Sequence, residues 1–163
     1  MLIKPDVLAI GETWLRKHIE SDLIGLPDYA LVRSDRAFGS RGGGVALYII
    51  DSLSFSLIEL PASPPGSHVD IVAASLRLNQ MRLAVVCVYW PPCSPRSDLD
   101  YIETCLCHVA SVNCDFVCLG DLNVNMLSIS DHSVEVLRDM MSHLSLTDYF
   151  DSYAYLGWLI IPH

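Results

Sequence analysis

Phe116-Val117-Cys118-Leu119-Gly120-Asp121-Leu122-Asn123 is the stretch around which the rest of the chain can be organised. Its apolar run predicts a strand, and Gly120 permits tight backbone geometry where that strand ends. Asp121 and Asn123 lie two positions apart, so their side chains project to the same side if the extended conformation continues. A carboxylate and an amide at a strand end suit work on a metal-bound phosphate or an activated water. A strand ending in Gly-Asp is also a common turn, so the interpretation depends on partners elsewhere in the chain.

Two other apolar runs also end in polar side chains. Residues 6–11 predict a buried strand that ends by presenting Glu12. Residues 82–90 form the second strand of a hairpin, apolar on both faces and therefore central, and this strand presents Tyr89 just before two prolines. Each residue has an ordinary alternative: Glu12 as a solvated acid at the start of a helix, and Tyr89 as a core tyrosine with a satisfied hydroxyl.

A glycine run, Arg41-Gly42-Gly43-Gly44, precedes a strand predicted over residues 45–50. Three glycines would let the backbone approach a phosphate closely, and Arg41 is then a candidate substrate contact. The run matches neither a P-loop nor a dinucleotide-binding fingerprint, because no Gly-Lys-Ser/Thr follows and the next element is a strand. The pattern therefore favours a turn.

The remaining periodicity predicts strands over residues 30–33, 55–60 and 69–78, and helices over 97–112 and from 130 or 131 to about 144. Strands and hairpins come first, and helices alternate with strands afterwards. This order indicates a single layered α/β domain with mixed sheets and helices outside.

Composition narrows the class of protein. The chain has 163 residues, of which 52% are hydrophobic, and this favours a well-cored domain over a disordered chain. No apolar run is long enough to span a membrane. A net charge of −9 has the wrong sign for holding nucleic acid by bulk electrostatics. It is compatible with an enzyme that recruits divalent cations through local carboxylates, although most of the charge is better explained as a surface that keeps the protein in solution.

The chain contains six cysteines, at positions 87, 93, 105, 107, 114 and 118. A zinc site built from the last four is disfavoured, because their spacing lacks the usual Cys-x2-Cys knuckle. Reduced thiols in an intracellular protein are the favoured interpretation.

If the three strand ends lie on one rim, they form a single pocket. Glu12 would bind Mg²⁺ and Asp121 would activate a water molecule. Asn123 and Tyr89 would orient a phosphate.

Four motifs in the expected order carry a resemblance to a known family: Ile10-Gly11-Glu12-Thr13-Trp14-Leu15, the Arg41–Tyr48 glycine segment, Val88-Tyr89-Trp90-Pro91-Pro92 and Gly120-Asp121-Leu122-Asn123. Over about residues 5–149 the chain resembles the endonuclease/exonuclease/phosphatase superfamily. More narrowly, it resembles the apurinic-type endonuclease domain of non-LTR retrotransposon polyproteins.

The resemblance implies a four-layered α/β-sandwich of the deoxyribonuclease-I-like kind, with mixed β-sheets. It implies Mg²⁺ (or Mn²⁺) as cofactor and a DNA phosphodiester as substrate, nicked to prime reverse transcription. A reverse transcriptase domain is then expected in the same polyprotein, and no membrane partner. By motif, Glu12 is the metal ligand, Asp121 helps to activate water, Asn123 positions the phosphate or its nucleophile, and Tyr89 contacts the phosphate.

The chain also departs from the family pattern. It lacks an earlier strand with an Asn at the metal site and a late Ser-Asp-His whose histidine is central to catalysis. Ser130-Asp131-His132 spells that triplet, but it stands only ten residues after Asp121 and is interpreted as the start of a helix. The tail over residues 151–163 does not continue the pattern.

We therefore expect residues 1–163 to form one partial domain, incomplete at both ends and weakly active or inactive. The expected location is intracellular, with the nucleus as one compartment. Two alternatives remain: a non-catalytic remnant that acts as an interaction module, and a phosphatase or RNA nuclease of the same superfamily.

Overall fold

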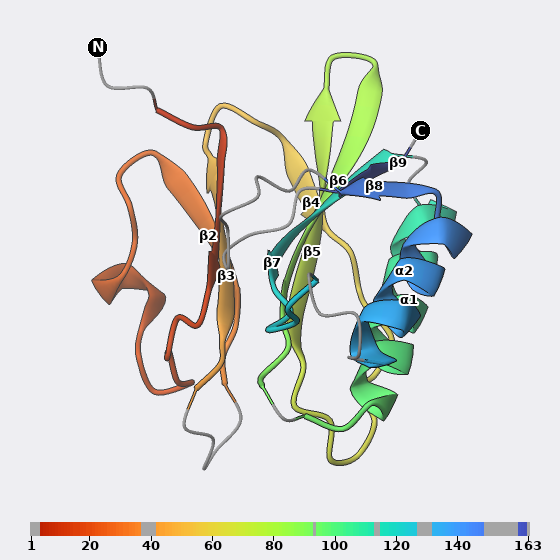
Figure 1. Cartoon of the computed structure of the whole chain (residues 1–163). Helices are drawn as coiled ribbons and strands as arrows, with labels where there is room; N and C mark the ends of the chain where they lie inside the picture. Colours follow the sequence, from red (N-terminus) through yellow and green to blue (C-terminus); the bar gives the residue numbers. More distant parts are fainter. Residues whose placement is uncertain are drawn as a thin grey trace.

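Two β-sheets and two α-helices make up the architecture in the computed structural model (Figure 1), which describes residues 4–36, 42–92, 94–112, 115–126, 132–148 and 160–162. The small sheet has the order β1-β3-β2, with both pairings antiparallel. Its strands are β1 (Val7–Gly11), β2 (Tyr29–Ser34) and β3 (Val45–Ile50).

The large sheet has six strands in the order β4-β5-β6-β7-β9-β8. They are β4 (Phe55–Leu57), β5 (Asp70–Leu78), β6 (Met81–Tyr89), β7 (Asp115–Asp121), β8 (Leu146–Asp148) and β9 (Ile160–Pro162). The sheet is mixed, as predicted: β6 and β7 are parallel and are joined by α1 (Ser97–Val112), whereas the other pairings are antiparallel. The second helix is α2 (His132–His143).

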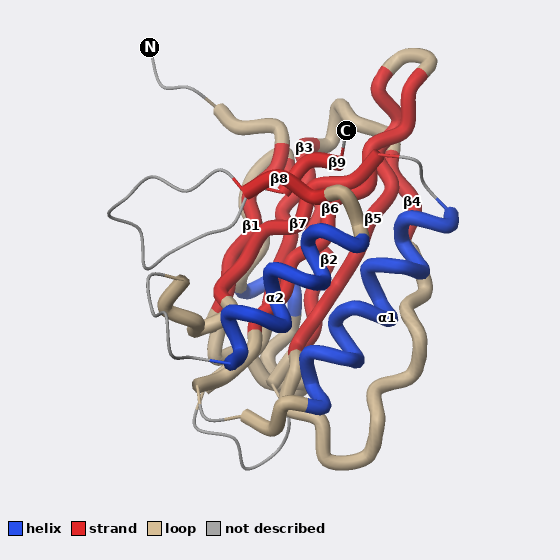
Figure 2. The backbone as a smooth tube through the Cα atoms, turned by 45° about the vertical axis from the view of Figure 1, so that its right-hand side comes forward, coloured by secondary structure: helices blue, strands red, loops and turns tan. Residues whose placement is uncertain are grey.

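The elements form layers. The helices α1 and α2 lie side by side over one face of the large sheet (Figure 2), and the small sheet lies on the other side (Figure 1). The outer face of the small sheet meets residues 12–28, which include the short 3-10 helix η1 (Ser21–Leu23). There Tyr48 Oη donates to the carbonyl of Ile24 at 2.8 Å, and the Arg33 guanidinium donates to the carbonyl of Ile19. The predicted α/β-sandwich with mixed sheets is confirmed.

The central strand β6 is covered on both faces, as its continuous apolar sequence predicted. Val86 and Val88 pack with side chains of α1 and α2, whereas Val85 and Cys87 pack with the small sheet. Successive side chains of a strand point to opposite faces of the sheet, so the helices cover one face of β6 and the small sheet covers the other. Residues of β6 can therefore be placed rigidly by packing from both directions.

Among the residues that the structure describes, no helix is long and apolar enough to cross a membrane. All four cysteines in the described part of the chain are free thiols: Cys87, Cys105, Cys107 and Cys118. Two elements of the C-terminal part, β8 and β9, have no counterpart in the predicted pattern. They pair with each other, and Ile160 of β9 pairs with Cys118 of β7.

Candidate active site at the strand ends

Three neighbouring strands of the large sheet bring polar side chains into one row. In the β-ladder register, Asp70 of β5 faces Tyr89 of β6, and Tyr89 faces Asp121 of β7. The row lies where β6 and β7 end and where the antiparallel β5 begins. The sheet alone therefore aligns two carboxylates on either side of a phenol.

Glu12 reaches this row from the other sheet. It follows the last residue of β1, and its backbone is left-handed, with φ 51°. The Tyr89 hydroxyl donates to Glu12 Oε1 at 2.7 Å, so this hydrogen bond bridges the ends of the two sheets. A left-handed glutamate is unfavourable in isolation and persists only where surrounding structure holds it, which is common at functional sites.

The loop that carries Glu12 is held by the glycine run. Thr13 N–H donates to Gly44 O at 3.0 Å, and Trp14 N–H donates to Gly43 O at 2.9 Å. Gly44 N–H donates in turn to Asp70 Oδ2 at 2.8 Å. Gly43 and Gly44 have φ of +101° and +84°, and a Cβ at Gly44 would lie 2.4 Å from Thr13 Oγ1. Glycine is therefore required here for close packing against the Glu12 loop, and the predicted phosphate contact Arg41 lies outside the described residues.

Gly120 has an equally specific reason to be glycine. Its φ is +138°, and a Cβ there would lie 1.8 Å from the carbonyl oxygen of Val88 on β6. Any side chain would separate β6 from β7 beside Tyr89 and Asp121. This glycine allows the two strands to stay paired up to the last residue of β7.

The backbone turns after Asp121, so the extended conformation does not continue to Asn123. Asp121 Oδ1 accepts the Asn123 N–H at 2.8 Å, and Asn123 is left-handed with φ 50°. Asn123 Nδ2 donates to Trp90 O at 3.0 Å, which holds the amide against the end of β6. The two side chains stay close because of this turn and not because of strand alternation.

Burial, and to a smaller extent neighbouring negative charge, raises the pKa of three side chains at the site. Burial raises the pKa of Asp121, and the charge of Glu12 adds to that rise, although the hydrogen bond from Asn123 N–H opposes it. Burial also raises the pKa of Asp70, with a smaller contribution from Asp35. The pKa of Tyr89 is raised by burial and by Glu12, so the phenol remains protonated and can donate at neutral pH.

We call Glu12, Asp70, Tyr89, Asp121 and Asn123 the strand-end site. Four of them are the residues named from the sequence, and the structure brings these four together. Asp70 was missed because it begins a strand instead of ending one. The signal was present: the Asn79-Gln80 turn sets a register in which Leu78 pairs with Met81 and Asp70 therefore pairs with Tyr89.

The strand-end site suits a hard divalent cation by its donor chemistry. Glu12 and Asp121 supply carboxylate oxygens, Asn123 an amide, and Mg²⁺ and Mn²⁺ prefer such oxygen ligands. Burial is the main cause of the raised pKa of Asp121 and the charge of Glu12 contributes to it, so a cation there would relieve the repulsion between the two carboxylates.

None of the histidines within the described ranges is hydrogen-bonded to a residue of this site. His132, the last residue of the Ser-Asp-His triplet, begins α2, and its Nδ1 lies 2.8 Å from Glu135 Oε2. Within the described residues, the Asp121 carboxylate accepts a hydrogen bond from Asn123 N–H and forms none with an imidazole.

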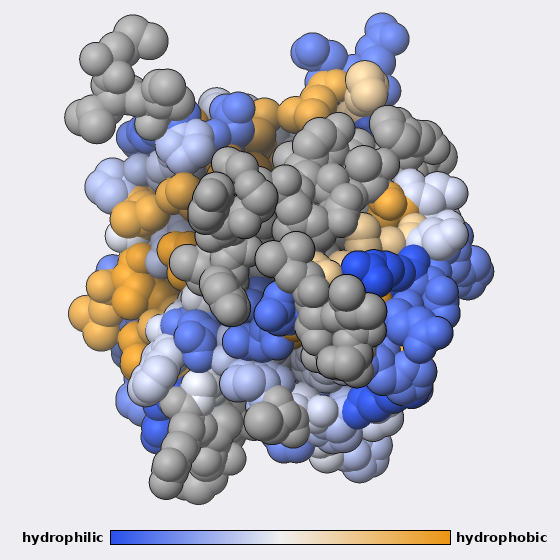
Figure 3. Space-filling view, in the orientation of Figure 1, coloured by the Kyte–Doolittle hydropathy of each residue, from blue (hydrophilic) through white to orange (hydrophobic). Residues whose placement is uncertain are grey.

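In the lower middle of the face shown in Figure 3, the residues coloured by hydropathy are mostly hydrophilic. Apolar side chains gather instead at the left edge of that face, over the 12–28 segment. Trp14 follows Glu12 by two residues and is 55% exposed, and the centroid of its ring lies 5.3 Å from the Arg36 guanidinium carbon. The loop that carries Glu12 therefore combines an acidic group with an exposed aromatic side chain.

No protein-family model matches the sequence, and no curated protein matches it closely enough to be recognised. Solved structures do match. The AP endonuclease LMAP from Leishmania major has a TM-score of 0.75 at 15% identity, over 97% of this chain and 70% of that chain.

The endonuclease domain of TRAS1, a telomere-specific non-LTR retrotransposon, has a TM-score of 0.69 at 15% identity, over 95% of this chain and 71% of that one. The mannosyl-6-phosphatase Bt3783 from Bacteroides thetaiotaomicron has a TM-score of 0.65 at 12% identity, over 96% and 71%. At such identities the likeness concerns the fold. The resemblance that the sequence motifs carry is confirmed at that level: this chain has the fold of the endonuclease/exonuclease/phosphatase proteins.

Proposed function

We propose that the chain is a metal-dependent phosphodiesterase of the endonuclease type that acts on DNA. One observation carries this proposal: Glu12 from one sheet meets Tyr89 from the other at 2.7 Å, beside Asp121 and Asn123. Mg²⁺ (or Mn²⁺) would be held by the carboxylates of Glu12 and Asp121. When bound, such an ion stabilises the negative charge that develops on a phosphodiester during hydrolysis.

The side chains have distinct tasks in this proposal. Asp121 accepts the proton of the attacking water, and its raised pKa brings it closer to the range in which a carboxylate is an effective base. The Asn123 amide donates to Trp90 O and also forms a side-chain hydrogen bond with Tyr89, and it would exchange the second bond for a phosphate oxygen when substrate binds. Tyr89 holds Glu12 through its hydroxyl, and that hydroxyl can turn to the phosphate when Glu12 binds a cation.

We expect turnover to be slow. A carboxylate that activates water without an imidazole partner is a weak base at neutral pH, since its pKa lies below that of histidine. The retrotransposon role is a narrower proposal, supported by the Glu-Thr-Trp-Leu and Tyr-x-Pro-Pro motifs and by the fold shared with the TRAS1 domain. In it, the nick primes reverse transcription by a reverse transcriptase domain of the same polyprotein, and the protein acts in the nucleus.

Nicking of supercoiled plasmid DNA tests the proposal. We expect slow formation of the open circular form in the presence of Mg²⁺ or Mn²⁺, none with a chelator, and none with Asp121→Ala. Asp139→Ala is the matched control, because Asp139 is an exposed aspartate on α2 away from the strand ends. Nicking that persists in Asp121→Ala would refute the assignment.

Calorimetry separates an active site from a non-catalytic remnant. We expect Mg²⁺ uptake that is lost in Glu12→Gln and retained in Glu20→Gln, which changes an exposed glutamate outside the site. Absence of uptake, together with absence of nicking, would favour an interaction module. Because a mannosyl-6-phosphatase shares the fold, release of inorganic phosphate from a phosphomonoester is measured in parallel. Phosphate release without nicking would move the assignment to the phosphatases.

A further inference from the structure

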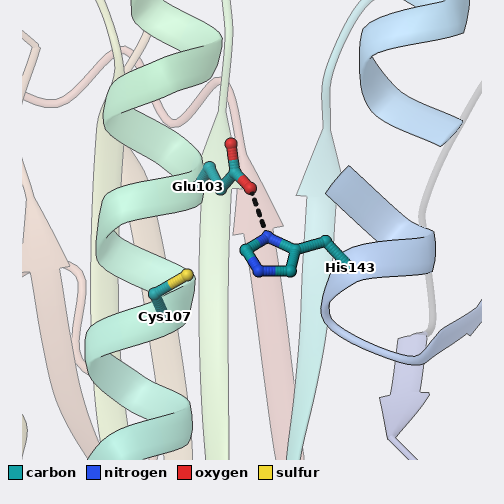
Figure 4. A group of neighbouring side chains, drawn as sticks. All are labelled: Glu103, Cys107 and His143. Carbon is teal, nitrogen blue, oxygen red and sulfur yellow. Dashed lines mark hydrogen bonds and ion pairs between the residues drawn. The ribbon is translucent and has the colours of Figure 1, made fainter. Parts of the chain in front are cut away.

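A second group of potential metal ligands lies on the helix layer, away from the strand ends. Glu103 and Cys107 stand on α1, and His143 is the last residue of α2 (Figure 4). The ligand atoms of these three residues all lie within 4.8 Å of one another, and no other such group of His, Cys, Asp and Glu occurs in the described part of the chain. We call these residues the helix triad.

The geometry of the helices creates the triad. Glu103 and Cys107 are four residues apart, so their side chains lie on the same face of α1. His143 comes to that face from the neighbouring helix, and its Nδ1 lies 2.8 Å from Glu103 Oε1. In Figure 4 the sulfur of Cys107 points toward the imidazole ring.

We propose that the helix triad binds a zinc ion that links α1 to α2. A thiolate, an imidazole and a carboxylate are the ligand types that select Zn²⁺, whereas Mg²⁺ prefers the oxygen donors of the strand-end site. Three protein ligands leave a fourth tetrahedral position for water. The triad is half-exposed to exposed, so an ion can enter from solvent.

The distances require only small side-chain movements. Zinc–ligand bonds of about 2.0–2.3 Å at tetrahedral angles place ligand atoms roughly 3.3–3.8 Å apart. The Glu103 oxygen and the His143 nitrogen, now 2.8 Å apart, must therefore separate slightly, and no pair of ligand atoms, all within 4.8 Å of one another, needs to approach by more than on the order of 1 Å. The side chains of Glu103 and His143 are 35% and 70% exposed, and both can rotate without disturbing the core.

Binding also has a defined proton balance. Cys107 must release its thiol proton to solvent, and His143 must present an unprotonated ring nitrogen. Burial and the charge of Glu103 raise the pKa of Cys107, so the thiol is protonated until a cation displaces the proton. The direct contact between Glu103 and His143 is replaced by their shared bond to the ion.

Titration with Co²⁺ as a spectroscopic substitute for Zn²⁺ tests the site. For the full chain kept reduced, we expect one equivalent of Co²⁺ to produce a thiolate-to-cobalt charge-transfer band, which excess Zn²⁺ abolishes. Cys107→Ser should remove the band, and His143→Gln should weaken binding by about tenfold or more.

His132→Gln is the matched control. His132 is an exposed histidine on α2, the helix that also carries His143. Its Nδ1 is likewise 2.8 Å from a glutamate oxygen, but among the described residues this pair is not part of a group of three potential metal ligands. We expect its Co²⁺ titration to equal that of the unmodified chain. Zn²⁺ should also raise the Tm of the unmodified chain and leave that of Cys107→Ser unchanged, because the site exists only in the folded state.

Absence of the band in the unmodified chain, or its persistence in Cys107→Ser, would overturn the proposal. Loss of the band in Glu12→Gln would equally overturn it, since the ion would then reside at the strand-end site. None of these outcomes depends on nuclease activity.

Discussion

Replacement of Gly120 by alanine is the most direct test of how the strand-end site is built. The alanine Cβ would lie 1.8 Å from the carbonyl oxygen and 2.8 Å from the carbonyl carbon of Val88, and φ at this position is +138°. Neither neighbour is a flexible side chain, because both belong to the backbone of β6. The β6–β7 ladder must therefore open beside Tyr89 and Asp121.

The expected cost follows from two contributions. A non-glycine residue in this backbone region carries roughly 1–3 kcal/mol of strain. Opening the end of the ladder sacrifices about two hydrogen bonds, each worth about 0.5–1.5 kcal/mol. The sum is about 2–6 kcal/mol, a large part of the roughly 5–15 kcal/mol that stabilises a typical domain.

Gly11→Ala is the matched control. Gly11 also ends a strand and also precedes an acidic site residue, but a Cβ there meets no atom within 4 Å. We expect its free energy of unfolding to change by less than about 1 kcal/mol. Urea unfolding, followed by tryptophan fluorescence and circular dichroism, gives both values under the same conditions. If the two variants differ by less than about 1 kcal/mol, the close approach of β7 to β6 at Gly120 is refuted.

Three further predictions concern side chains at the strand ends. Burial and Glu12 raise the pKa of Asp121, so the folded state binds the carboxyl proton of Asp121 more tightly than the unfolded chain does. The stability that comes from protonating Asp121 is therefore present in acid and is lost as pH rises through the raised pKa. Asp121→Asn should therefore be more stable than the unmodified chain at neutral pH, and the difference in the free energy of unfolding should shrink in acid. Urea unfolding of both proteins at neutral and acidic pH measures this difference, and a difference that stayed constant would contradict the prediction. Tyr89→Phe removes the hydrogen bond to Glu12 and should lower plasmid nicking by about tenfold or more, at a cost of about 1 kcal/mol in stability; unchanged nicking would argue against Tyr89 as a site residue. Trp14→Ala should weaken binding of a fluorescent single-stranded oligonucleotide by about 1–3 kcal/mol, because an exposed indole beside Arg36 suits stacking on a base, and an unchanged Kd would exclude this contact.

Much of the fold was predictable because the patterns are local. The helix predicted over residues 97–112 is observed as α1 (Ser97–Val112), since its apolar stripe and acidic first turn require no information from elsewhere in the chain. The strand predicted over 45–50 is likewise observed as β3. The sequence of β6 is apolar on both faces, and this correctly predicted that β6 lies between two layers. A strand with one face in solvent would carry polar residues on that face.

Long-range pairing explains what the sequence pattern did not predict. The strands β8 and β9 are short, and their extended conformation depends on pairing with each other and with β7. Local propensity is weak over three residues, so tertiary contacts decide such strands. The sequence pattern raises zinc only for cysteines close in sequence, with His108 nearby. The helix triad instead joins Cys107 to His143, which only the packing of α1 against α2 brings together.

In the strand-end site, too, some features are set by local sequence and others by long-range packing. The sequence by itself determined that Glu12, Tyr89 and Asp121 stand at strand ends, because apolar runs and glycines mark those ends locally. Only the tertiary structure decided that the ends meet, since Glu12 and Tyr89 are 77 residues apart and belong to different sheets. It also decided the left-handed turn that holds Asn123 and the register that adds Asp70. Side-chain spacing is a property of the chain, but the approach of two sheets depends on the packing of the whole core.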